Sequence, residues 1–182
     1  MTSRTAHVRR MAAYNAWMNA RVFEAAMGLD DAALAADLGA FFSSILGTLN
    51  HLAVADTIWL QRFAAHPAWR ALLEPVRTLP PPTALDQRLF DDIRGLHAHR
   101  RLLDDVISAW AVSIDEPDLD HALRYANTRS VVSVRSSFDL LMHFFNHQTH
   151  HRGQVTTLLT QAGVDVGVTD LLALIPNEAP QA

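Results

Sequence analysis

The sequence predicts an all-α protein built as a four-helix bundle. Four long segments carry apolar residues at the spacing of one helix face, and each is bounded by capping or helix-breaking residues. With 182 residues, 49% of them apolar and 19% charged, the chain fits one globular domain over residues 1–182. There is no cysteine, which excludes disulfides, thiolate metal ligands and catalytic thiols.

The first helix is expected from about His7 to Met27, because Val8 and the apolar residues after it recur at helical spacing. Gly28 is a typical stop signal. Asp30 or Asp31 then caps a short helical piece that reaches Ala36.

The second helix is expected from about Phe41 to Ala65 and is apolar nearly all round, which is typical of a helix inside a bundle. Two ionisable residues interrupt it. A buried carboxylate needs a partner, so Asp56 should lie near a cation or a donor, such as an arginine of a neighbouring helix. His51 is a candidate metal ligand, although a lone histidine on an apolar helix is more often an ordinary core residue.

A loop is expected over residues 66–82, which end in three prolines. Thr83 is expected to cap the third long helix, from about Ala84 to Ile114. His97 and His99 lie among charged residues on the outer side of this helix, look exposed to solvent, and are not proposed as ligands.

A small β-hairpin is expected between the third and fourth long helices, because residues 119–134 form two short extended pieces around a polar turn. The fourth long helix begins at an N-cap, Ser136 or Ser137, and ends at Gly163. Leu171–Ile175 is apolar and is predicted to form a short docking helix.

The fourth helix holds four of the ten histidines within residues 143–151. Steps of about 100° per residue place His147 and His151 together towards the core, one turn apart, and His150 towards solvent, with His143 ambiguous. Two such imidazoles can chelate one metal ion, as in His-x-x-x-His zinc proteases. No Glu follows the first histidine, so the general base of those enzymes is missing. Hydrogen-bonded rings without metal are the alternative.

The formal net charge of −4 argues against a broad nucleic-acid surface. The first residues lead into an amphipathic pattern, not a secretory signal, and no window is apolar enough to span a membrane. We therefore expect a cytoplasmic protein without nucleic-acid or membrane partners.

The chain resembles the DinB family, within the larger DinB/YfiT-like superfamily. The resemblance covers nearly the whole chain and is carried by three stretches: Tyr14–Arg21, Ile45–Asp56 and Asn146–Gln154. It implies a four-helix bundle with a long crossover, and homodimers formed through helix faces.

The resemblance also implies one divalent metal ion bound by three histidines, which fall on His51, His147 and His151. Three neutral imidazoles leave at least one open coordination position, which is typical of a catalytic site. Zinc and nickel both suit such a ligand set. Asp56, Asn146 and Tyr14 are candidates for groups that orient the ligand rings; no catalytic residue is assigned.

Relatives in the wider superfamily use the metal to activate a low-molecular-weight thiol, and others look like metal-dependent hydrolases. The resemblance therefore implies a thiolate or hydroxide nucleophile acting on a small electrophilic substrate, in the manner of a thiol transferase. The alternative is a non-catalytic stress-response or binding protein in which the metal is structural. DNA binding is suggested only by the family's association with DNA damage, and the acidic charge balance opposes it.

Overall fold

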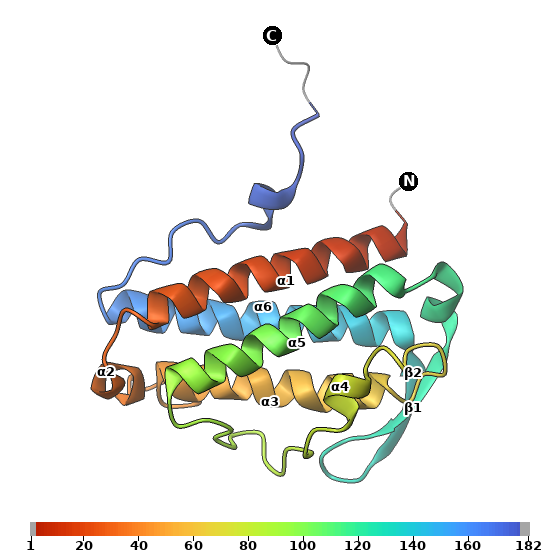
Figure 1. Ribbon diagram of the computed structural model, residues 1–182, viewed down its shortest axis with the longest axis horizontal. Helices are drawn as coiled ribbons and strands as arrows, with labels where there is room; N and C mark the ends of the chain where they lie inside the picture. The colour runs from red at the N-terminus through yellow and green to blue at the C-terminus, as the bar shows by residue number, and fades with distance from the viewer. Residues whose placement is uncertain (1–2, 179–182) are drawn as a thin grey trace.

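The computed structural model describes residues 3–178 and shows a bundle of four long helices (Figure 1). These are α1 (Arg4–Ala26), α3 (Ile45–Phe63), α5 (Ile93–Ser113) and α6 (Ser137–Gln161). Each packs against two others, in the order α1, α5, α3, α6 around the bundle. Helices α3 and α5 run in the same direction, so the chain between them returns along the bundle (Figure 1). The predicted four-helix bundle with a long crossover is confirmed.

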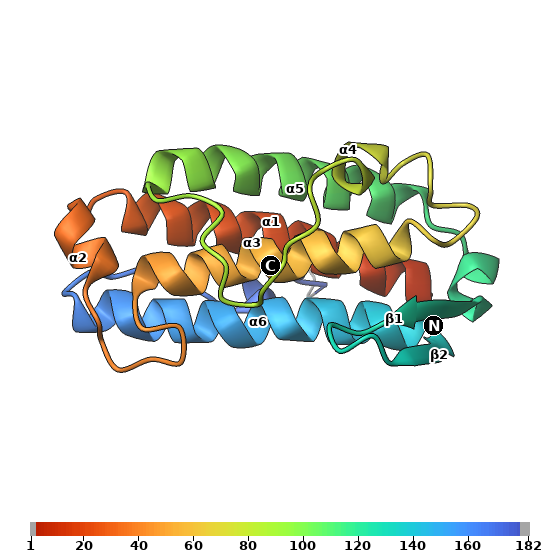
Figure 2. The ribbon, with the colours of Figure 1, turned by 90° about the horizontal axis from the view of Figure 1, so that it is seen from below.

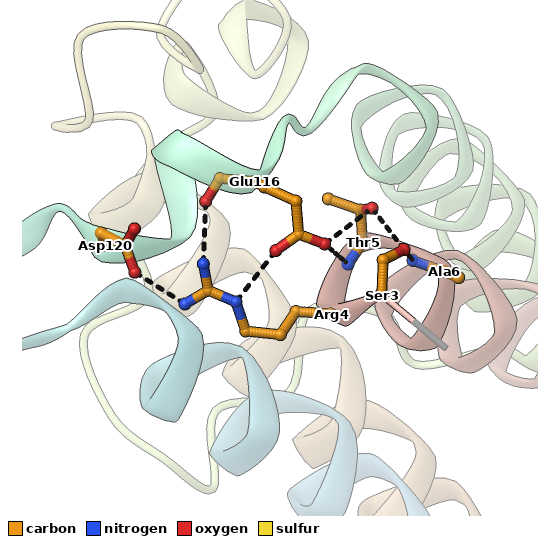
Figure 3. A network of polar contacts seen from close by, with 6 residues as sticks. All are labelled: Ser3, Arg4, Thr5, Ala6, Glu116 and Asp120. Carbon is orange, nitrogen blue, oxygen red and sulfur yellow. Dashed lines mark hydrogen bonds and ion pairs between the residues drawn. The ribbon is translucent and has the colours of Figure 1, made fainter. Parts of the chain in front are cut away.

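Helix α1 begins three residues before the predicted start, because side chains of Ser3 and of Glu116, which is far away in sequence, hold its first turn. The hydroxyl of Ser3 accepts a hydrogen bond from the N–H of Ala6 and caps the helix. Glu116 accepts from both the N–H and the hydroxyl of Thr5, at 3.0 and 3.1 Å, and pairs with Arg4 at 2.9 Å (Figure 3). A carboxylate at this position also offsets the positive end of the helix dipole.

Between α1 and α3 lies the short helix α2 (Asp31–Ala35), whose N-cap is Asp30. The prediction that the second long helix starts near Phe41 was wrong. Residues 41–44 form a turn in which Ser43 has a left-handed backbone with φ of 63°. Helix α3 starts at Ile45, where the Ser44 hydroxyl accepts from the third N–H of the helix at 3.0 Å.

The crossing segment, residues 64–92, connects α3 to α5 and passes across the face of α3 (Figure 2). It contains the short helix α4 (Glu74–Arg77). The predicted helix start at Ala84 was wrong, because α5 begins only at Ile93, after the N-cap Asp92. The reason is the buried side chain of Asn50. It accepts hydrogen bonds from the N–H groups of residues 89 and 90 and donates to the carbonyl of residue 90, which replaces helical bonding there.

The hairpin predicted before the last long helix is confirmed. A 3₁₀ helix, η1 (Glu116–Asp120), leads into β1 (Ala122–Ala126), which pairs antiparallel with β2 (Val132–Ser136). Leu123 is the buried residue of β1 and fastens the hairpin to the core. Helix α6 then starts after its N-cap Ser136, as predicted.

The histidines of α5 are less exposed than expected. The ring of His97 stacks on Phe23 at 5.3 Å, and that of His99 lies 5.3 Å from Phe90. Both are half-buried, because the crossing segment and α1 cover this side of α5.

After α6 the chain turns at Gly163, whose φ is 79°, and runs back over the outer side of α1 (Figure 1). The predicted docking helix is present as a single 3₁₀ turn, η2 (Leu171–Leu174). The hydroxyl of Tyr14 fastens this segment by donating to the carbonyl of Thr169 at 2.7 Å. Among the described residues, no helix combines the length and the apolar character needed to cross a membrane.

Candidate metal centre

Three histidines from two helices converge between α3 and α6. The Nε2 atom of His51 lies 3.2 Å from that of His151 and 3.4 Å from that of His147. One nitrogen from each ring can be chosen so that all three lie within 4.8 Å of one another. Within residues 3–178, no fourth histidine or carboxylate joins this group.

The geometry of the two helices explains this convergence. His147 and His151 are one turn apart on α6, so their side chains point the same way. His51 approaches them from the antiparallel helix α3. The facing predicted from sequence agrees with the structure, since His150 is exposed. His143 lies outside the group, with its ring 6.0 Å from the His147 ring and 5.0 Å from that of Trp59.

Hydrogen bonds to the opposite ring nitrogens fix two of the three imidazoles. Nδ1 of His51 lies 2.8 Å from the carbonyl oxygen of Leu85, and Nδ1 of His151 lies 2.7 Å from Oε1 of Gln154. Both oxygens can only accept, so both Nδ1 atoms must donate. In the neutral rings the Nε2 atoms therefore carry lone pairs.

Two of these lone-pair atoms face each other at 3.2 Å, with no N–H between them. This contact is repulsive unless a cation lies between the rings. A tetrahedral zinc ion with Zn–N bonds of about 2.0–2.1 Å would hold its nitrogens roughly 3.3 Å apart. The donor set and its spacing thus fit a divalent transition ion.

Burial keeps all three rings in the neutral, ligating form. Burial and, to a smaller extent, the neighbouring histidines lower the pKa of His147 to about 3. Burial likewise lowers the pKa of His151 to about 4 and lowers that of His51. No proton has to be displaced near neutral pH before a metal ion binds.

Aromatic and apolar residues wall the centre on the side of the crossing segment. The ring of Phe42 stacks on His51 with centroids 3.8 Å apart and meets His151 edge-on at 5.7 Å. Phe42 and Leu85 also line a cavity of about 670 Å³ next to the centre. Phe41, in the same lining, is 87% exposed.

A second cluster of polar side chains is buried deeper in the bundle. Asp56 accepts hydrogen bonds on one oxygen from the guanidinium of Arg100 and, at 2.9 Å, from the amide of Gln148. The expectation that Asp56 needs a partner, and the suggestion of an arginine from a neighbouring helix, are confirmed. Gln148 lies between the two α6 histidines in sequence, so its bond to Asp56 ties α3 to α6 beside the metal centre.

The same cluster continues to α1 and includes all four long helices. Asp104 pairs with Arg100 at 3.0 Å and accepts from the amides of Asn15 and Asn19, at 3.0 and 2.8 Å. Arg152 donates to the amide oxygen of Asn15. Two carboxylates thus face two guanidiniums, and the buried charges balance. We call these seven residues (15, 19, 56, 100, 104, 148 and 152) the ionic cluster.

Sequence reasoning missed the groups that orient the ligand rings. Gln154 could have been found, because it lies three residues after His151 on the same helix face. The carbonyl of Leu85 carries no signal in sequence. Of the predicted candidates, Asp56 bonds to the ionic cluster, Asn146 is exposed, and the hydroxyl of Tyr14 holds the C-terminal segment.

Comparisons with known proteins agree with this structure. The model of the DinB family matches residues 1–181. Protein DinB of Bacillus subtilis (strain 168) is 25% identical over 160 residues, which cover 86% of this chain and 87% of that protein. The search of solved structures gave no significant match. Because the family model spans almost the entire sequence, the chain belongs to the DinB family.

Proposed function

We propose that the protein binds one divalent transition metal ion through Nε2 of His51, His147 and His151. The observation that carries this proposal is the pair of Nε2 lone pairs facing each other at 3.2 Å, each fixed by a donated Nδ1–H bond on the opposite side of its ring. Three neutral imidazoles suit zinc or nickel, and elemental analysis of the purified protein decides between them.

We further propose that the ion serves catalysis on a small electrophilic substrate. A divalent cation with an open position supplies Lewis acidity, which acidifies a water or thiol ligand so that a nucleophile is available near neutral pH. The residues of the chain orient the rings and exclude water on one side. The lack of a fourth protein ligand among the described residues supports an open position, as in catalytic zinc sites.

The nucleophile distinguishes a thiol transferase from a hydrolase. We favour a low-molecular-weight thiol, as the family resemblance implies. Cobalt-substituted protein should develop an intense near-ultraviolet absorption band when a thiol binds to the metal. Ester hydrolysis without such a band would favour the hydrolase instead.

The test of catalysis compares metal-loaded protein with the His147→Ala variant across panels of thiol acceptors and esters. We expect turnover only in the metal-loaded protein. If neither protein turns over any compound while metal still raises the melting temperature, the metal is structural and the non-catalytic alternative holds. We also propose that the protein is cytoplasmic and forms a homodimer. Sedimentation equilibrium tests the oligomeric state.

A further inference from the structure

Arg62 is a half-buried cation near the candidate metal centre, and it has no counter-ion within residues 3–178. It lies on α3, and no acidic side chain within residues 3–178 forms an ion pair with it. Burial lowers the pKa of its guanidinium, which shows that the charge is partly removed from water. A partly desolvated cation without a partner is unfavourable, and a bound anion would relieve that penalty.

Two aromatic rings hold the guanidinium in a fixed orientation. Its central carbon lies 4.7 Å from the ring centroid of Trp59 and 5.2 Å from that of Tyr125 on the hairpin. The two rings pack against the guanidinium, and no acceptor within residues 3–178 takes a hydrogen bond from its N–H groups. None of these nitrogens is sealed from solvent. A guanidinium that is already held in place can donate two N–H bonds to one carboxylate.

The position of Arg62 connects it to the metal centre. It follows His51 by eleven residues, close to three helical turns, so both side chains leave the same face of α3. The guanidinium lies 4.7 Å from the ring centroid of Trp59, and Trp59 follows His51 by eight residues, a helical rise of about 12 Å. We take this rise as the spacing between the guanidinium and the His51 ring along the helix. The exposed ring of His143 lies between the two sites, 5.0 Å from the Trp59 ring and 6.0 Å from the ring of His147.

We propose that Arg62, on its platform of Trp59 and Tyr125, is an anion subsite that binds a carboxylate of the substrate. The inference rests on the proposed function, because the reacting end of the same molecule must reach the metal centre. It names the substrate class: a small acidic molecule whose carboxylate lies about 12 Å from the atom at the metal. A molecule with a much shorter spacer cannot occupy both positions.

The test uses hydroxamates, which chelate protein-bound zinc without needing a reaction. Suberic acid monohydroxamate carries a carboxylate six methylenes from the chelating group, and octanohydroxamate has the same chain without the charge. We expect zinc-loaded protein to bind the acidic compound more tightly. The Arg62→Gln variant should lose about tenfold in affinity for it, measured by calorimetry, and bind octanohydroxamate unchanged.

Two controls make the result specific. Arg124→Gln removes an exposed arginine next to Tyr125 that points to the opposite face of β1, and it should change neither affinity. Succinic acid monohydroxamate is too short to span the distance, so its affinity should not depend on Arg62.

Each other outcome overturns the inference in a recognisable way. Equal affinity of wild type and Arg62→Gln for the suberic compound removes the anion subsite and leaves the metal site intact. An equal loss for both eight-carbon compounds shows that Arg62 only supports the hairpin. If the protein takes up no zinc at all, the proposed function fails together with the inference.

Discussion

The candidate metal centre joins α3 and α6, whereas the ionic cluster beside it joins all four long helices. The two clusters differ in how their buried charges are balanced. In the ionic cluster, two arginines balance two aspartates. The match is one of charge, because some buried atoms of the cluster, such as Oδ1 of Asp56, have no hydrogen-bond partner within residues 3–178. In the metal centre, acceptors face acceptors, and the donors of the rings point away to Leu85 and Gln154. A cluster whose charges balance internally serves the fold, whereas one whose acceptors face each other could hold a cation.

The largest expected effect comes from breaking the ionic cluster. Arg100→Met leaves two buried carboxylates without their cation, and we expect it to lower the free energy of unfolding of the metal-free protein by about 3–5 kcal/mol. Urea denaturation measures the loss. The matched control is Arg101→Met, which alters the exposed neighbour and should cost less than about 0.5 kcal/mol. Similar losses in both variants would contradict a special role for the cluster.

Loss of a histidine from the metal centre should instead leave the stability of the metal-free protein almost unchanged and remove the stabilisation by zinc. His147→Gln removes a ligand but no internal partner, so the metal-free protein should unfold within about 1 kcal/mol of wild type. Zinc at a hundredfold excess over its Kd should stabilise wild type by about 2.7 kcal/mol, and this gain should vanish in the variant. His150→Gln alters an exposed histidine of the same helix and should keep the gain. If His147→Gln keeps it too, this histidine is not a ligand.

A smaller loss of zinc affinity is expected when the orientation of the His151 ring is disturbed. Gln154→Leu removes the acceptor for Nδ1 of His151, and we expect zinc to bind about 10–100-fold more weakly. Competition with a chromophoric chelator measures this. Gln154→Glu restores an acceptor and should bind zinc at least as well as wild type. A Leu variant with undiminished affinity would show that Gln154 does not orient the ring.

A pH dependence of stability is also expected for the metal-free protein, of about 2 kcal/mol per histidine by pH 5. In the folded protein the pKa values of His147 and His151 are lowered to about 3 and about 4, while an unfolded histidine keeps 6.5. Between these values the unfolded chain binds more protons, so stability falls as the pH drops below 6.5 towards 4. Urea midpoints at pH 7, 6 and 5 should therefore decline more in wild type than in His147→Gln. Parallel declines would assign the pH dependence to other groups.

The fold and the centre were predictable where local pattern determines structure. Helical periodicity placed His147 and His151 on one face, and the serine and aspartate caps marked several helix starts. The helix start wrongly predicted at position 84 shows the limit of predicting structure from local pattern. Leu85, Leu89 and Phe90 mimic a helical face, yet a single buried side chain, Asn50, binds that backbone in another conformation. Such a long-range bond leaves no periodic trace.

The orienting groups show the same limit at the site itself. The acceptor for the His51 ring is a backbone carbonyl on the crossing segment, and any residue at position 85 would provide it. Arg62 and Tyr125 are far apart in sequence and come together only through the docking of the hairpin.

The carbonyl at position 85 belongs to a stretch of chain without regular structure, residues 81–92. The side chains of Asn50 and His51 fasten this stretch to α3 by hydrogen bonds. The tautomer of the His51 ring therefore depends on whether this stretch is packed against α3. Protease nicking near residues 81–88 would release the ring to rotate without cutting either ligand-bearing helix. Zinc retention during limited proteolysis would then report on the stretch itself, and bound zinc should slow its cleavage.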